Sequence, residues 1–161
     1  MFGFFKKKNE TLSIGSPVKG RTVELSQVPD PTFGEEILGK GIAVIPEDGK
    51  IYAPVDGEIS MMFDTGHAVS IVSDDGCEIL VHVGLDTVTM KGDGFTRHGK
   101  NGDHVSKGQL LLEVDLEKVK AAGFETITPV VICNTDNYET VSGLSGKQVE
   151  PGDEIIVITK K

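Results

Sequence analysis

Two internal repeats constrain the fold of this chain more than any other feature of its sequence. The segment Ser16-Pro17-Val18-Lys19-Gly20 is echoed by Ala53-Pro54-Val55-Asp56-Gly57. A second pattern, Gly-x-x-Val-x-x-Gly followed after two residues by an apolar pair, occurs at 102–112 and again at 146–156. Its paired glycines suit reverse turns that lead into apolar strands. Two copies of each motif therefore predict a pseudo-symmetric β sandwich.

Short apolar runs separated by turn residues extend over the rest of the chain. They include Gly41–Ile45, Glu58–Phe63, Gln109–Val114, Pro129–Cys133 and Glu154–Ile158. This spacing predicts an all-β antiparallel sandwich or barrel. One helical turn is expected over 115–122, because Asp115 can cap its start and Gly123 can end it. We expect a flexible leader over residues 1–11 and a single domain over residues 12–161.

Composition excludes several classes of protein. The formal net charge of −9 over 161 residues argues against a nucleic-acid-binding surface and favours basic partners. Two cysteines, Cys77 and Cys133, are too few for a disulfide framework, so we expect reduced thiols in a cytoplasmic protein. No apolar stretch is long enough to span a bilayer. We interpret Met1–Lys8, apolar and then basic, as a disordered leader, with weak contact to an anionic membrane surface as the alternative.

A hairpin with a histidine on each strand lies at the centre of the chain. Asp75-Gly76 is a strong signal for a two-residue type I′ turn, which would pair Val69 with His82. A loop at Asp74-Asp75 would instead pair His67 directly with His82. Both registers place the two imidazoles on one face, about 5 to 8 Å apart at Cβ, whereas a three-residue loop would separate them.

Alternation along the second strand indicates which face carries the histidines. Ile79, Val81, Val83 and Leu85 form the apolar set that should face the core. The other set contains Leu80 and His82 and should face solvent or a partner. On the first strand, His67 would share its side with Thr65, Val69 and Ile71. A histidine pair among small and apolar residues on an outer face indicates a functional site.

Three uses of such a histidine pair compete: a zinc site, acid–base catalysis and a phosphohistidine. Catalytic zinc normally takes three protein ligands. His82 and Asp86 have an H-x-x-x-D spacing, but H-x-H and H-E-x-x-H are absent, so a metal site would need a ligand from a partner. The sequence has no nucleophile elbow and no P-loop. His98 and His104 lie in a polar loop, where we expect both to be solvated.

These residues satisfy the requirements of a phosphohistidine site better than those of the other two uses. It needs a neutral imidazole with one nitrogen open and the other held by a hydrogen bond. It also needs a second donor for the phosphoryl oxygens and an apolar rim that excludes water. His82 and His67 can supply the first two. The rim would come from Phe63, Val69, Ile71 and Leu80.

A series of specific motifs covers nearly the whole chain after its first dozen residues. They are Val28-Pro29-Asp30, Gly41-Ile42-Ala43, Ala53-Pro54-Val55-Asp56-Gly57, Thr65-x-His67-Ala68-x-Ser70-Ile71, Val81-His82-x-Gly84-x-Asp86-Thr87-Val88, Lys91-Gly92-x-Gly94-Phe95 and Thr128-Pro129-Val130-Val131. In these motifs the sequence resembles the glucose family of enzyme IIA, from the bacterial phosphoenolpyruvate-dependent sugar phosphotransferase system. The resemblance implies an antiparallel β sandwich with a duplicated hybrid motif, and a phosphocarrier function.

The resemblance also implies roles for individual residues. His82 matches the histidine that accepts phosphate on Nε2 from the histidine phosphocarrier protein and passes it to a cysteine of a glucose-type permease's IIB domain. His67 matches the second histidine, which assists onward transfer, and Thr65 matches the residue that orients it. The Gly84 carbonyl matches the acceptor of the active histidine's Nδ1–H. Asp30 and Asp86 match acidic residues that flank the site and would attract basic residues of a partner.

Cofactors, partners and departures from the family complete the comparison. We expect a cytoplasmic monomer that requires no cofactor, with zinc at His67 and His82 only when a partner supplies a further ligand. Regulation of other proteins belongs to some members of the family. This chain has valines (Val69, Val81 and Val83) where some relatives have phenylalanines near the site, and Gly66 where some have a polar residue.

Two other functions remain as alternatives. A sandwich-fold zinc metallopeptidase should copurify with stoichiometric zinc. A carrier domain of the biotinyl or lipoyl kind would need a modified lysine at a hairpin tip, and the sequence contains neither Met-Lys-Met nor Asp-Lys-Ala.

Overall fold

The structure is a computed structural model that describes residues 10–161. An eight-stranded sheet in the order β13-β2-β3-β11-β7-β6-β5-β9 is its largest element, and every pairing in it is antiparallel. Its strands are β2 (Gly20–Val23), β3 (Lys40–Pro46), β5 (Gly57–Met62), β6 (Ala68–Ser73), β7 (Glu78–His82), β9 (His104–Val105), β11 (Thr128–Ile132) and β13 (Gln148–Val149). The antiparallel β architecture predicted from the sequence is confirmed.

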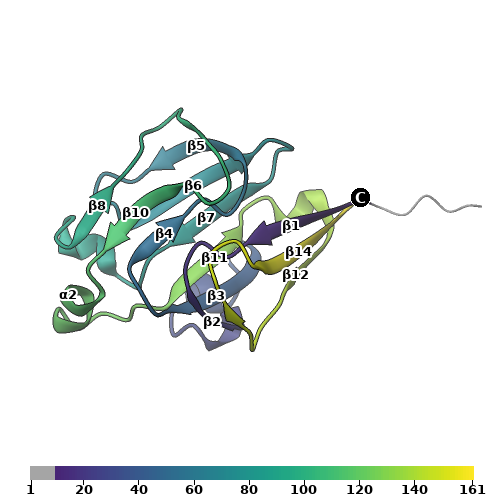
Figure 1. Ribbon diagram of the computed structural model, residues 1–161. Coiled ribbons are helices and arrows are strands. Elements are labelled where there is room, and N and C mark those ends of the chain that lie inside the picture. The colour runs from purple at the N-terminus through teal and green to yellow at the C-terminus, as the bar shows by residue number, and fades with distance from the viewer. Residues whose placement is uncertain (1–9) are drawn as a thin grey trace, which may run out of the picture.

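Two three-stranded sheets complete the β structure of residues 10–161. One has the order β1-β14-β12 and the other β4-β10-β8. Their strands are β1 (Thr11–Gly15), β4 (Lys50–Tyr52), β8 (Phe95–Arg97), β10 (Leu110–Val114), β12 (Tyr138–Gly143) and β14 (Glu154–Lys160). Figure 1 shows the sheet of β1, β14 and β12 on one side of the molecule and α2 on the opposite side.

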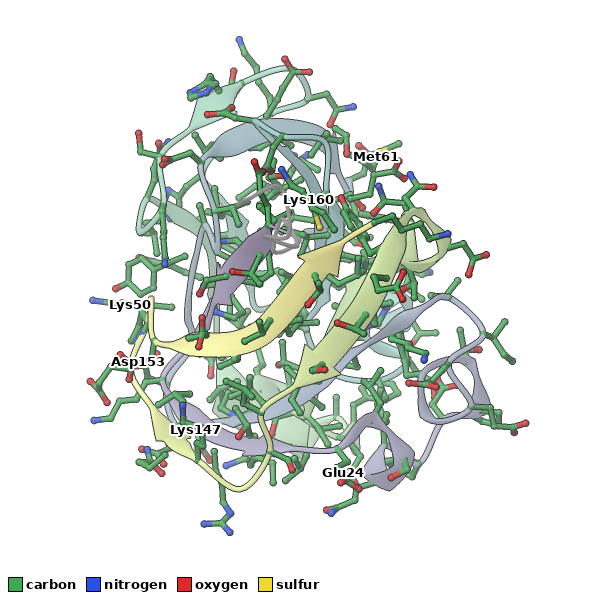
Figure 2. All side chains as sticks on the ribbon, turned by 90° about the vertical axis from the view of Figure 1, so that its right-hand side faces the viewer. Glu24, Lys50, Met61, Lys147, Asp153 and Lys160 are labelled. Carbon is green, nitrogen blue, oxygen red and sulfur yellow. The ribbon has the colours of Figure 1, made fainter. Side chains whose placement is uncertain are left out.

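The sequence repeats are repeated in space. Gly20 at the start of β2 pairs with Val149 of β13, and Gly57 at the start of β5 pairs with Val105 of β9. Each glycine lies where a strand crosses close to a neighbour: a Cβ on Gly20 would come within 2.0 Å of a backbone oxygen, and one on Gly57 within 2.3 Å. Lys147 and Asp153, on the connections that flank β13, project at the edge of the molecule in Figure 2. The repeated motifs therefore encode two equivalent β units.

The helices are short. They are α1 (Pro31–Gly34), α2 (Leu116–Ala121) and the 3-10 turns η1 (Leu25–Gln27), η2 (Thr87–Met90) and η3 (Thr135–Asn137). The predicted caps of α2 are confirmed, since the Asp115 carboxylate accepts from the Lys118 N–H and Gly123 follows with φ +88°. Helix α1 was not predicted from the sequence, although the Asp30 carboxylate caps it by accepting from the Thr32 N–H at 3.0 Å.

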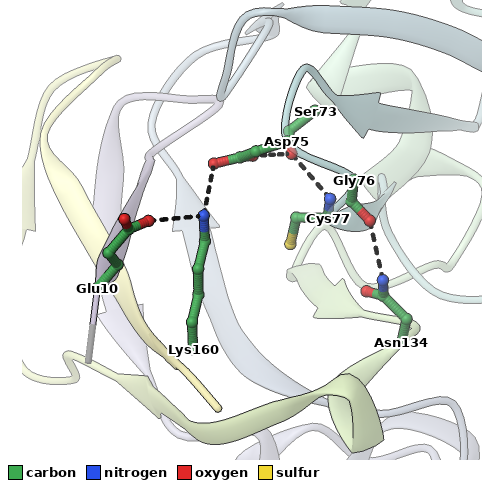
Figure 3. Close-up of polar contacts among 7 residues, drawn as sticks. All are labelled: Glu10, Ser73, Asp75, Gly76, Cys77, Asn134 and Lys160. Atoms are coloured by element: carbon green, nitrogen blue, oxygen red, sulfur yellow. Dashed lines mark hydrogen bonds and ion pairs between the residues drawn. The ribbon is translucent and has the colours of Figure 1, made fainter.

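The first strand, β1, begins inside the segment that we expected to be a leader. We assigned residues 1–11 to a leader, but Thr11 pairs with Thr159 of β14, and the Glu10 carbonyl accepts from the Lys160 N–H. The Lys160 ammonium also contacts the carboxylates of Glu10 at 3.1 Å and Asp75 at 3.8 Å (Figure 3). The segment Met1–Lys8 lies outside the described residues. Within residues 10–161, no helix has the length and apolar character that crossing a membrane requires.

The register of the β6–β7 hairpin differs from both predicted registers. Val72 pairs with Glu78 and Ala68 pairs with His82, so the loop has three residues, 74–76. The Ser73 hydroxyl fixes this loop by donating to the Asp75 carboxylate and accepting from the Cys77 N–H (Figure 3). Gly76 has φ +92° and is therefore the left-handed residue that a three-residue hairpin loop requires. The prediction of a two-residue type I′ turn is therefore wrong.

Buried side chains lie on both faces of the central sheet. The main core includes Val69, Ile71, Ile79, Val81 and Val83, and a second cluster contains Leu25, Val28, Phe33, Ala43, Ala68, Leu80, Leu85 and Val131. β11 is buried at each of its five residues, because it lies in the middle of the sheet with a cluster on each face. The second cluster is the one beside the histidines.

Candidate functional site: a histidine pair at the end of a hairpin

The two imidazoles lie side by side despite the altered register. The ring centroids of His67 and His82 are 5.1 Å apart, with the ring planes at 78°. Strict strand alternation in the observed register would have put them on opposite faces. His67 escapes this rule because it precedes β6 and follows Gly66, which has φ +71° in the turn that leads into the strand. The prediction that the two rings lie close together is confirmed. However, the turn before β6 brings them together, and the strand register does not.

A backbone hydrogen bond fixes the tautomer of His82. Its Nδ1–H donates to the Gly84 carbonyl at 2.7 Å, because a carbonyl oxygen can only accept. The neutral ring then has its lone pair on Nε2. Burial lowers the pKa of His82, against weaker raising effects of the Gly84 hydrogen bond and the carboxylates of Asp30 and Asp86. The lowered pKa favours the neutral ring, whose lone pair is on Nε2.

His67 is the more enclosed ring of the pair. Its residue is 4% exposed, and its Nδ1 lies 2.5 Å from the Thr65 hydroxyl. Burial, and then repulsion from His82, lower the pKa of His67 to about 4. When the Thr65 hydroxyl donates to Nδ1, the ring hydrogen resides on Nε2. His67 can then act as a neutral hydrogen-bond donor inside the site.

Aromatic rings close the apolar side of the site. Phe63 meets His67 edge-on with the centroids 5.3 Å apart, and Phe33 meets His82 at 5.0 Å. Phe63 was predicted from its place in the hairpin. Phe33 was missed, because it comes from α1, and only the Asp30-Pro31 signal for a helix start pointed to that turn. Nothing in the sequence indicates that this turn packs on His82.

Two predicted rim residues do not reach the surface. Val69 and Ile71 are each 0% exposed and belong to the main core, so they cannot contact a partner. The error follows from the hairpin register, since the three-residue loop turns both side chains to the face away from His82. Leu80 is 9% exposed and lies in the second cluster, on the His82 side of β7.

An acidic hollow lies near His82, since its Asp30 and Asp86 carboxylates act on the charge of that ring. It has a volume of about 400 Å³ and is lined by Pro29, Asp30, Pro31, Leu85, Asp86, Gly123, Phe124 and Glu125. Asp30 and Asp86 were predicted here. Glu125 is a third carboxylate that sequence analysis missed, since it lies 39 residues beyond Asp86 and no motif includes it.

The other two histidines and the two cysteines lie outside the site. His98 and His104 are exposed, with Nε2 atoms 3.8 Å from Glu113 and 3.2 Å from Asp74. The cysteines are free thiols, and burial raises the pKa of both Cys77 and Cys133. Among residues 10–161 no cluster of three or more histidine, cysteine or acidic side chains could hold a metal ion.

Comparison with known families agrees with this geometry. Residues 12–138 match the model of the phosphoenolpyruvate-dependent sugar phosphotransferase system, EIIA 1 family. The chain belongs to this family. As an enzyme IIA, it is a phosphocarrier of the phosphotransferase system, and therefore a component that transfers phosphoryl groups.

Relatives of this enzyme IIA occur both as separate proteins and as parts of larger ones. The glucose-specific EIIA component of Halalkalibacterium halodurans is 43% identical over 99% of this chain and 96% of its own length. The beta-glucoside-specific EIIBCA component of Bacillus subtilis is 44% identical over 91% of this chain, but the chain spans only 24% of that protein. The solved structure of glucose permease IIA from Mycoplasma capricolum has a TM-score of 0.87 and 32% identity, and the match covers 98% of this chain and 99% of that one.

Proposed function

We propose that Nε2 of His82 is the atom of this enzyme IIA that carries the phosphoryl group. The observation that supports this is the hydrogen bond from Nδ1–H to the Gly84 carbonyl, which leaves the Nε2 lone pair available. The lone pair attacks the phosphorus of an incoming phosphohistidine, and the donor's N–P bond breaks with its electron pair returning to the donor nitrogen. The Nδ1 proton stays in place, so the phosphorylated ring is an imidazolium held by the same carbonyl.

The donor in this proposal is the histidine phosphocarrier protein, and the acceptor is a cysteine in the IIB domain of a sugar permease. In the second step the thiolate attacks phosphorus, and the electron pair of the N–P bond returns to Nε2 of His82. The fusion of IIA to IIB and IIC in the beta-glucoside-specific relatives supports a IIB acceptor. Asp30, Asp86 and Glu125 line the hollow beside His82, where a basic residue of either partner would be attracted.

His67 assists the transfer in this proposal. With its hydrogen on Nε2, it donates to a phosphoryl oxygen on His82 and stabilises the charge that develops during transfer. Thr65 orients the ring through Nδ1. Phe33 and Phe63 exclude water from the apolar side, which slows hydrolysis of the phosphohistidine.

The remaining parts of the proposal concern the setting of this chemistry. The names of the relatives favour a glucose-type or β-glucoside-type permease, and we propose a cytoplasmic monomer. No cofactor is required. His67 and His82 provide two nitrogen ligands, so zinc would bind here only with a ligand from a partner.

The test is transfer of labelled phosphate from phosphoenolpyruvate through the two general phosphotransferase proteins. The wild-type chain should acquire an acid-labile, base-stable phosphate. His82→Gln should abolish labelling, whereas His67→Gln should still accept phosphate but transfer it poorly to a IIB domain. Persistent labelling of the His82 variant would refute the assignment. Stoichiometric zinc in the purified protein, together with peptidase activity, would favour the metallopeptidase instead.

A further inference from the structure

The segment that carries the Gly84 carbonyl is held from three directions. The Val83 N–H donates to the His67 carbonyl at 2.7 Å, and the Leu85 N–H donates to the Glu125 carbonyl at 3.1 Å. The third bond comes from the Thr87 hydroxyl, which donates to the Val83 carbonyl at 2.6 Å. The first two bonds use backbone groups that almost any residue supplies. Only the third depends on the identity of a side chain.

Thr87 contacts this segment with both of its side-chain branches. Thr87 is 0% exposed and is the first residue of η2. The hydroxyl binds the carbonyl of the residue before Gly84. The methyl group closes the space beside Gly84 itself, since a Cβ built there would lie 2.7 Å from Thr87 Cγ2. Gly84 has φ +75°, so its peptide units adopt an unusual orientation that these contacts hold.

We infer that Thr87 is a positioning residue for phosphoryl transfer, which aims the Gly84 carbonyl at Nδ1 of His82. The inference rests on the proposed function of His82. If the carbonyl moves away, the Nδ1–H hydrogen bond weakens, and the neutral ring populates the tautomer with its hydrogen on Nε2. That tautomer has no lone pair on the reacting nitrogen. Thr87 thus determines how much of the protein is competent to accept phosphate.

A matched threonine separates this role from ordinary stabilisation. Thr22 in β2 is also 0% exposed, and its hydroxyl donates to the Leu144 carbonyl at 2.7 Å. In the sheet order, β3 and β11 separate β2 from β7, which is about 14 Å at the usual spacing between strands. Replacing either threonine by valine keeps the shape of the side chain. Thr87→Val removes the bond to the Val83 carbonyl, whereas Thr22→Val removes the bond to the Leu144 carbonyl and also the one that the Thr22 hydroxyl accepts from the Lys147 N–H at 3.0 Å, so the control loses at least as many hydrogen bonds.

The experiment compares Thr87→Val, Thr87→Ser and Thr22→Val in the full chain. The ¹⁵N chemical shifts of the His82 ring report its tautomer, and the initial rate of labelling reports phosphoryl acceptance. In Thr87→Val, we expect the shifts to move towards the Nε2–H tautomer and the rate to fall about tenfold, as for other groups that orient a reactive imidazole. Thr87→Ser keeps the hydroxyl and should restore the tautomer and most of the rate. Thr22→Val should lose stability without a change in tautomer.

Two results would overturn the inference. One is a wild-type tautomer and labelling rate in Thr87→Val. The other is an equal loss of rate in Thr22→Val, which would show that general destabilisation is the cause. Thr87→Ala, which also lacks the hydroxyl but cannot clash, replaces Thr87→Val if that variant does not fold. Labelling that survives His82→Gln would instead refute the proposed function, so the two failures are distinguishable.

Discussion

The backbone at Gly84 makes a quantitative prediction possible. Gly84 and Gly76 both have positive φ, at +75° and +92°, and they lie at opposite ends of the β6–β7 hairpin. Alanine at either position strains the backbone by about 1–2 kcal/mol. A Cβ on Gly76 meets nothing within 4 Å, whereas a Cβ on Gly84 lies 2.7 Å from both the Glu125 carbonyl oxygen and Thr87 Cγ2. Gly84→Ala therefore adds a clash that Gly76→Ala lacks.

The clash has two measurable consequences. Overpacking of this kind costs roughly 1–3 kcal/mol, so Gly84→Ala should be less stable than Gly76→Ala by that amount. Because the chain has no tryptophan, far-ultraviolet circular dichroism in urea is the suitable measurement. Displacement of the Gly84 carbonyl should also weaken its bond to His82 and lower the labelling rate about tenfold, with little change in Gly76→Ala. Equal destabilisation of the two variants, or a wild-type labelling rate in Gly84→Ala, would refute the reasoning.

Further predictions follow from the pKa shifts of the two histidines. The pKa of His67 is lowered from 6.5 to about 4 in the folded protein, so the unfolded chain binds more protons between these values, and the free energy of unfolding should fall as the pH is lowered through this window. The loss of unfolding free energy should be about 2 kcal/mol after allowance for solvent screening. Urea titrations at several pH values measure it in the wild type and in His67→Gln, which lacks the titrating group. A pH dependence as steep in His67→Gln as in the wild type would contradict the prediction. Asp86 raises the pKa of His82, so Asp86→Asn should lower that pKa in an NMR titration. The same variant should slow labelling most at low ionic strength, and an unchanged rate at low salt would argue against a role in attracting the donor.

The hairpin illustrates how far a sequence pattern can be taken. Alternation correctly separated Ile79 and Val81 from His82, because side chains on one strand follow a strict period of two. The pairing of that strand with its neighbour depends on the loop, and there the prediction was wrong. The Ser73 hydroxyl stabilises a three-residue loop that the Asp75-Gly76 signal did not distinguish from a two-residue one. One extra loop residue moved Val69 and Ile71 from the expected rim into the core.

Contacts between distant segments were the other limit. The position of Asp30 before Pro31 is a local signal for a helix start, yet the packing of Phe33 on His82 joins residues 49 positions apart. Glu125 likewise reaches the acidic hollow only because the connection from α2 to β11 passes beside Leu85. No periodicity carries such information, since it depends on how separate elements fill space together.

By itself the sequence determined the β architecture and the duplicated units, and its motifs indicated the family and, through that resemblance, His82, His67, Thr65 and Gly84 as site residues. These follow from local backbone preferences and from motifs whose residues lie close together in the chain. Only the tertiary structure decided how the two rings come together, which aromatic side chains enclose them and which apolar side chains are buried. The physical reason is that register and burial are set by the fit of whole elements against one another, where one residue of loop length reverses the face that a side chain occupies.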